Sequence, residues 1–154
     1  MRNGTRRFAI IAALASAMLP VRGAVAPAPP ATFTGKVVPL ADAVSRSGGR
    51  LDSDAAPFWL ALATDDGKLF PLVKDGGSRL FFKDPALLNR PMRLTGRLVP
   101  GSSLLQVTLV HSLVKGEAHV VYYWCDICSI KRGEKMTCEC CGGPMVRHEE
   151  AVKK

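Results

Sequence analysis

Short apolar runs, several of them alternating with polar residues, recur along the chain from about residue 33 to residue 124. The clearest alternation covers 92–98 and 105–110, where every second residue would line one face of a strand. Gly, Pro, Ser and Asp separate these runs, as they do between the strands of a β protein. The pattern predicts strands over 33–40, 58–64, 68–74, 92–98, 105–110 and 119–124.

Two local signals refine this pattern. Asp65-Asp66-Gly67 lies between two apolar runs, and Asp-Gly tolerates the positive φ of a tight turn, so a hairpin is expected there. Asp84 can cap, and Pro85 can begin, one short helix over 84–88. The stretch 41–57 is rich in Gly, Ser and Asp, which predicts a long connection without regular structure.

The order of these elements indicates a fold. Three strands, a short helix and two further strands resemble an oligonucleotide/oligosaccharide-binding (OB) barrel. A five-stranded sandwich and an SH3-like barrel are the alternatives. We therefore expect a mainly β protein with a small five-stranded OB-like barrel over 33–117 and a separate segment after it.

The first residues have the layout of an export signal. Arginines precede an apolar run at 8–19, and small residues follow around Gly23. This predicts a signal peptide over 1–23 and a periplasmic or extracellular location. The apolar run is shorter than the roughly 20 residues of a membrane-spanning helix, so no stable membrane span is expected after cleavage. The pair Arg6-Arg7 leaves the twin-arginine route as an alternative.

Cleavage of the signal changes the charge of the protein. Residues 1–23 contain four arginines and no acid, so their removal lowers the formal charge from +8 to +4. That excess is too small to indicate nucleic acid or another anionic polymer as a partner. The next segment, 24–32, is almost entirely Ala and Pro, which predicts an extended linker.

All five cysteines of the chain lie between residues 125 and 141. Four of them form two C-x2-C pairs with nine residues in between. A two-residue spacer lets one tight turn present two sulfurs to a single ion, and zinc accepts four thiolates at about 2.3 Å. The spacing therefore predicts a tetrahedral metal site.

An aromatic strand leads into the first pair, a basic turn follows at 131–135, and Gly142-Gly143 follows the second pair. In these features, residues 122–146 resemble zinc ribbons with rubredoxin-type knuckles, in which the glycine allows a left-handed turn that points backbone amides at sulfur. The resemblance implies a zinc-ribbon-like module over 118–148, before a charged tail at 149–154. Its implied Zn²⁺ ligands are Cys125, Cys128, Cys138 and Cys141. The whole chain resembles small exported bacterial proteins of uncharacterised function that end in such a module.

The fifth thiol, Cys140, leaves alternatives open. It can be an extra thiol, reactive or not, or it can replace Cys141, because C-x-C also chelates. Cu⁺ prefers fewer and softer ligands, so a five-sulfur cluster near two methionines is an alternative to a zinc site. His148 is near enough in sequence to substitute for a cysteine. Disulfides are a further alternative, since exported cysteines meet an oxidising environment, although five sulfurs leave one unpaired.

Catalytic signatures are scarce. The three histidines are isolated in sequence, and the aspartate pairs lie in turn-like segments where carboxylates usually cap amides. No phosphate-binding loop, nucleophile elbow or metalloprotease motif is present. We therefore expect a protein that is not an enzyme.

Three classes of function remain. The first is an exported binding or scaffolding module with a structural zinc site and an unknown protein or polymer partner. The second is copper or heavy-metal binding, or thiol redox chemistry, at Cys140. The third is single-stranded nucleic-acid binding, which is disfavoured because stacking aromatics are not interleaved with the basic residues. Those basic residues are Arg79, Lys83, Arg90, Arg93 and Arg97.

Overall fold

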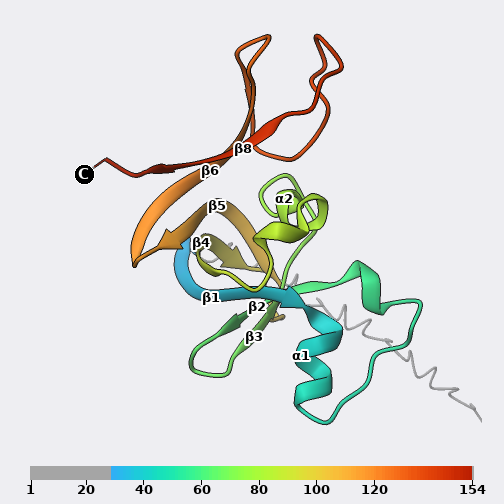
Figure 1. Cartoon of the computed structure of the whole chain (residues 1–154). Helices are drawn as coiled ribbons and strands as arrows, with labels where there is room; N and C mark the ends of the chain where they lie inside the picture. The colour runs from blue at the N-terminus through green and yellow to red at the C-terminus, as the bar shows by residue number, and fades with distance from the viewer. Residues whose placement is uncertain (1–28, 154) are drawn as a thin grey trace, which may run out of the picture.

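The structure is a computed structural model that describes residues 29–153 (Figure 1). The predicted signal peptide and most of the predicted linker lie outside the described residues. Within 29–153, no helix is both long and apolar enough to cross a membrane. In chain order the elements are β1 (Ala31–Pro39), α1 (Leu40–Arg46), the 3-10 helix η1 (Ala56–Phe58), β2 (Leu60–Thr64), β3 (Leu69–Pro71), α2 (Arg79–Lys83), the 3-10 helix η2 (Pro85–Leu87), β4 (Pro91–Leu98), β5 (Leu105–Val114), β6 (Glu117–Cys125), β7 (Ile130–Arg132) and β8 (Val146–Ala151).

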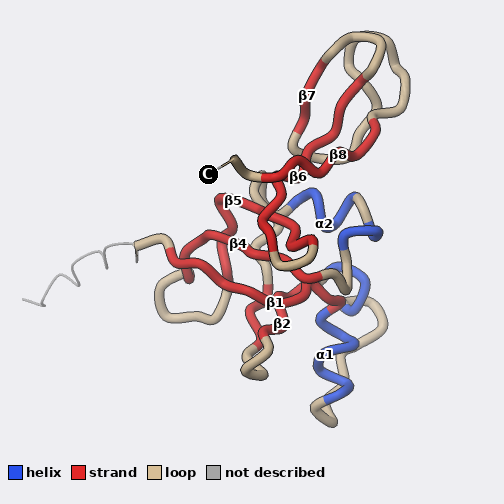
Figure 2. The backbone as a smooth tube through the Cα atoms, turned by 60° about the vertical axis from the view of Figure 1, so that its left-hand side comes forward, coloured by secondary structure: helices blue, strands red, loops and turns tan. Residues whose placement is uncertain are grey.

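The strands form one open sheet in the order β3-β2-β1-β4-β5-β6-β7, with β8 paired to β6 (Figure 2). All of the pairings between named strands are antiparallel. The expected closed five-stranded barrel is therefore wrong, although a mainly β fold is confirmed. The chain just after β3 makes one isolated parallel bridge to the start of β5, between Leu72 and Leu105. There the Val73 N–H donates to the Leu105 carbonyl at 3.0 Å.

The physical reason for the open sheet is the length of β5 and β6. These strands continue past the end of β4 as a hairpin, and the far end of β6 then pairs with β7 on one side and β8 on the other. The cysteine-bearing segment thus adds its strands to the sheet that precedes it. The predicted boundary between 117 and 118 falls at the start of β6, and the division into domains stays a prediction.

Several local predictions are confirmed. Strands β2 and β3 form the expected hairpin, and Gly67 in the turn between them has φ +80°. The carboxylate of Asp84 accepts from the Ala86 N–H at the start of η2, with Pro85 in the first helical position. Strand β1, however, begins at Ala31, so it includes the last two residues of the predicted linker.

Five elements were not expected: α1, η1, α2, β7 and β8. Helix α1 occupies part of the connection predicted to lack regular structure, and it is short, with Ala43 as its buried residue. Its apolar residues Leu40, Ala43 and Val44 have helical spacing, but nearby Ser, Gly and Asp obscure that signal. Helix α2 precedes η2, and β8 includes half of the predicted charged tail.

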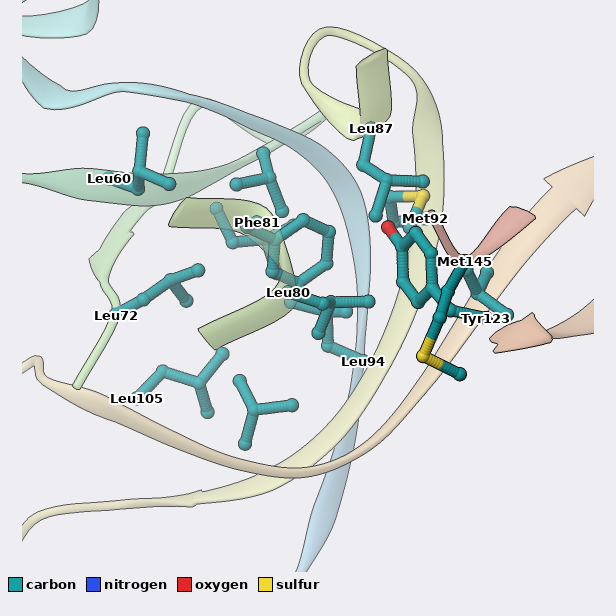
Figure 3. Packing of buried hydrophobic residues seen from close by; sticks show 14 of the residues in the cluster. Leu60, Leu72, Leu80, Phe81, Leu87, Met92, Leu94, Leu105, Tyr123 and Met145 are labelled. Carbon is teal, nitrogen blue, oxygen red and sulfur yellow. The ribbon is translucent and has the colours of Figure 1, made fainter. Parts of the chain in front are cut away.

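The hydrophobic core lies between one face of the sheet and α2 with η2 (Figure 3). Phe81 of α2 and Leu87 of η2 pack among buried residues of the strands, including Leu62 and Leu94. Each fully buried side chain of this size contributes roughly 1.5 to 3 kcal/mol relative to an exposed one. Buried residues of the C-terminal segment continue the same cluster: Tyr123, Cys125, Cys138 and Met145. The cysteine-bearing loops are therefore packed against the main core.

Candidate metal centre

The two cysteine pairs lie on the loops that project beyond β6 and β8 at one end of the molecule (Figure 1). Cys125 ends β6 and Cys128 precedes β7, whereas the second pair lies between β7 and β8. The sulfurs of Cys125, Cys128, Cys138 and Cys141 all lie within 4.8 Å of one another. All five cysteines of the described part are free thiols. The structure thus brings together the four residues that the spacing selected.

The distances fit a tetrahedral ion. An ion at about 2.3 Å from four sulfurs holds those sulfurs about 3.8 Å apart. The Sγ atoms of Cys125 and Cys141, from different loops, are 3.6 Å apart. This pair therefore already has nearly the separation that a bound zinc ion would impose, and every other pair of the four sulfurs lies within 4.8 Å.

The two cysteine loops share a backbone conformation. The Ser129 N–H donates to the Cys125 carbonyl at 2.8 Å, and the Gly142 N–H donates to the Cys138 carbonyl at 2.8 Å. Both residues after the pairs have positive φ, +53° at Ser129 and +70° at Gly142. The expected role of Gly142 is confirmed, and Ser129 adopts the same left-handed conformation without being glycine.

Backbone N–H groups of the second cysteine loop favour the thiolate form of Cys138. The N–H groups of Cys141 and Cys140 lower the pKa of Cys138 to about 6, because a hydrogen bond to a thiolate favours the charged form. The thiol of Cys140, followed by burial, raises the pKa of Cys128 above its usual value. Four thiols so close together repel one another when ionised, so a cation is needed to hold all four as thiolates.

The site has a buried side and an accessible side. Cys125 and Cys138 are 1% and 2% exposed, and both belong to the hydrophobic core. Cys128 is half-buried, and Cys141 is exposed. A metal ion held here would therefore connect the core to a surface of the protein.

The remaining candidate ligands lie outside this group. Cys140 is exposed and does not belong to the group of four sulfurs. His148 is on β8, where its ring stacks on Tyr122 with centroids 5.4 Å apart. Met145 is buried in the core, and Met136 packs against the same core. Sequence reasoning had left each of these residues open as a metal ligand.

Charged side chains fasten the knuckles to the rest of the fold. Glu134, between the two knuckles, lies 3.6 Å from Arg79 and 3.2 Å from Lys83 of α2. The carboxylate of Glu149 on β8 accepts hydrogen bonds from both terminal guanidinium nitrogens of Arg90, at 2.6 and 2.9 Å. Three of the five basic residues considered for nucleic acid thus pair with acids of the C-terminal segment.

Asp84 is the buried centre of a second set of contacts. Its carboxylate accepts from the Tyr123 hydroxyl and from Arg147, each at 2.8 Å. Burial opposes ionisation of Asp84, but these two donors outweigh it and hold the pKa of the carboxyl below its usual value. Sequence reasoning identified Asp84 only as a helix cap, because nothing in the local pattern shows that β6 and β8 will reach it.

A separate hollow of about 350 Å³ lies beside η1 and β3, far in sequence from the cysteines. It is lined by Lys74 and by five apolar residues, among which Phe58 and Trp59 are 65% and 44% exposed. Large aromatic side chains are costly to expose in pairs, so such a hollow is a candidate binding surface. In the sequence, the adjacent aromatics Phe58 and Trp59 are the signal that points to this hollow.

The histidines do not form a catalytic group among the described residues. His111 lies opposite Arg93 across β4 and β5, where burial and then the guanidinium lower its pKa. His119 Nδ1 lies 3.0 Å from the Glu117 carbonyl.

No protein-family model matches the chain, and comparison with curated proteins and with solved structures found no match.

Proposed function

We propose that this chain is an exported, non-enzymatic binding or scaffolding protein whose C-terminal segment is held by a structural zinc ion. The observation that carries the proposal is the group of four thiols within 4.8 Å, two of which are buried in the core. A metal at that position links β6 to the loop before β8 and makes the C-terminal segment part of the rigid fold.

The donor set favours zinc over copper. Four sulfurs arranged for a tetrahedron match the preference of Zn²⁺, whereas Cu⁺ is satisfied by fewer soft ligands. The two methionines near the cluster, Met145 and Met136, pack in the core and against it, respectively, as apolar side chains. Because Cys125 and Cys138 are almost inaccessible, the role that fits this ion is structural.

The binding part of the proposal rests on the hollow at Phe58 and Trp59. It is apolar, open to solvent and distant in sequence from the metal loops, so the metal site would stabilise the fold while this surface contacts a partner. A fluorescent apolar probe should bind the mature protein and bind at least fivefold more weakly to Trp59→Ala. Equal binding to Trp59→Ala and wild type would remove this surface from the proposal.

Native mass spectrometry of protein recovered from the periplasm or medium tests export and metal together. We expect a chain that begins at Ala24, carries one Zn²⁺ and has one rapidly alkylated thiol, Cys140. Cys125→Ser should lose the ion, whereas Cys140→Ser should keep it. Retention of residues 1–23 would contradict export. A metal-free chain with paired cysteines would contradict the zinc site, and copper at higher stoichiometry would favour the copper-binding alternative.

A further inference from the structure

Strand β8 forms an edge of the sheet, and one hydrogen bond shows which way its peptide groups point. It pairs with β6 alone. The Val152 N–H, one residue past β8, donates to the Ala118 carbonyl at 2.9 Å, in the register of the β6–β8 pair. Hydrogen-bonded pairs recur at every second residue of an antiparallel ladder, so Val146, His148 and Glu150 also bond to β6.

The residues between them have the opposite orientation. The N–H and C=O groups of Arg147, Glu149 and Ala151 point away from β6, and no other strand within residues 29–153 pairs with them. Strand β8 contains neither a proline nor a bulge, two devices that block pairing at a sheet edge. This edge is therefore open to one more strand.

The side chains on the outer face of β8 complement a second copy of themselves. Residues 146–152 have the pattern Val-x-His-x-Glu-x-Val on the face that points away from the core. Val146 and Val152 are 50% and 45% exposed, and both polar residues between them are exposed. A twofold axis at Glu149 places each Val146 opposite the partner's Val152. The same axis places each His148 opposite the partner's Glu150.

Backbone and side chains select the same register. The next registers that keep the hydrogen bonds place His148 opposite His148 or Glu150 opposite Glu150, and both set a valine against a polar side chain. In the selected register the two Glu149 side chains meet on the inner face. Each of them is already compensated by Arg90 at 2.6 Å and by Arg147 at 3.4 Å.

We propose that the protein forms a homodimer in which β8 pairs antiparallel with β8 of a second copy, so that the two sheets become one. Glu149 bonds to the partner's Glu149, and Arg147 bonds to the partner's Ala151. The dimer carries the hollow at Phe58 and Trp59 twice, so a polymer or clustered partner can be held at two points.

Sedimentation equilibrium of the chain without its signal peptide, with Zn²⁺ present, tests the dimer. We expect a reversible monomer–dimer equilibrium. Ala151→Pro removes an N–H that points away from β6, so it should raise the dimer Kd at least tenfold and leave the fold intact by circular dichroism. Ala151→Ser is the matched control, because it keeps that N–H, and it should dimerise as the wild type does. A chain that is monomeric at every concentration, or a dimer unaffected by Ala151→Pro, would overturn the proposal.

Exchange of charge tests the register. His148→Glu sets a carboxylate opposite the partner's Glu150 and should raise the dimer Kd at least tenfold. Adding Glu150→His restores the opposite pairing, so the double variant should return to within threefold of the wild type. Both variants lose the ring that stacks on Tyr122, so the difference between them reports the cross-strand pair alone. A double variant as weak as His148→Glu would show that this register is wrong.

Amide hydrogen exchange measured by nuclear magnetic resonance locates the interface. The N–H groups of Glu149 and Ala151 should exchange at least tenfold more slowly in the concentrated wild-type chain than in the His148→Glu variant. The N–H of Glu150, which bonds to β6, should be protected in both proteins. Equal exchange rates at Glu149 and Ala151 in the two proteins would exclude the β8 edge as the interface.

Discussion

At the scale of single residues, Asp84 makes contacts that hold distant parts of the chain together. Its carboxylate caps η2, accepts from Tyr123 on β6 and accepts from Arg147 on β8. Only 4% of Asp84 is exposed, so these partners replace nearly all of its hydration. A buried carboxylate is stabilising only while such partners remain.

Replacing Asp84 by Asn should lower the free energy of unfolding by about 2 kcal/mol, the typical worth of a hydrogen bond to a charged group. The Arg147 guanidinium, in a partly buried position, would lose one of its two charged partners and keep Glu149 at 3.4 Å. Urea denaturation followed by circular dichroism measures the change. Asp66→Asn is the matched control: its ion pair with Lys68 is exposed, so the urea midpoint should not move. Equal effects of the two substitutions would contradict the special role of Asp84.

The same contacts predict how stability depends on pH. Asp84 and Glu149 both have pKa values lowered in the folded state, Glu149 chiefly by its hydrogen bond with Arg90. A carboxyl with a lowered pKa stabilises fully above its unfolded value, near pH ~4, and the contribution is lost as the pH falls through the folded value. The urea concentration at the unfolding midpoint should therefore decrease when the pH is lowered below 4. The decrease should be smaller in Asp84→Asn. Parallel pH profiles for the two proteins would show that Asp84 contributes nothing to acid sensitivity.

At the scale of elements, the approach of the α2 segment to β5 depends on one glycine. Gly77 lies just before α2, and a Cβ atom there would be 1.8 Å from the Val107 carbonyl oxygen. No Cβ atom fits at that separation, so the residue must be glycine where this loop crosses the sheet. The position of Phe81, a central core residue on α2, follows from this close contact.

Gly77→Ala should therefore destabilise the protein by about 2 to 3 kcal/mol, since the loop must move away from β5 and loosen the core behind it. The neighbouring Gly76 gives a matched control, because a Cβ atom there meets nothing within 4 Å. Gly76→Ala should leave the thermal midpoint within the error of the measurement. If the two alanine variants melt together, the close contact with Val107 is not a constraint on the fold.

At the scale of the whole molecule, the sheet and the cysteine-bearing loops share a core but differ in what stabilises them. Phe81, Leu94 and their neighbours bury a large apolar surface without any metal. The loops from 126 to 145 contribute few buried side chains of their own. Ordering a residue costs roughly 1 to 2 kcal/mol in backbone entropy, so we expect these loops to depend on the proposed ion, since structural zinc can supply about 10 to 16 kcal/mol.

Removal of zinc with a strong chelator should therefore unfold the loops and spare most of the sheet. Trp124 on β6 pairs with both β7 and β8, so its near-ultraviolet circular dichroism should be lost. Trp59, beside η1, should report no change. Measuring Trp124→Phe and Trp59→Phe separately assigns each signal to one tryptophan. An unaltered Trp124 signal after complete removal of the metal would show that the loops are stable without it.

The sequence determined those features that neighbouring residues decide by themselves. Asp-Gly between apolar runs was enough for the β2–β3 hairpin, and Asp84-Pro85 was enough for the start of η2. The cysteine spacing was enough to select the four thiols that the fold brings within 4.8 Å, because two residues between sulfurs fix the geometry of each turn. These are short-range constraints of backbone conformation and chelate geometry.

Tertiary structure alone decided how the parts combine. Whether the sheet closes depends on how far β5 and β6 extend and on which strands β6 then pairs with, and the alternation of residues does not contain that information. The pairing of Asp84 with Arg147 joins residues 63 positions apart, and the 3.6 Å approach of the Cys125 and Cys141 sulfurs depends on how the two cysteine loops face each other. Long-range contacts of this kind are set by the packing of the whole chain.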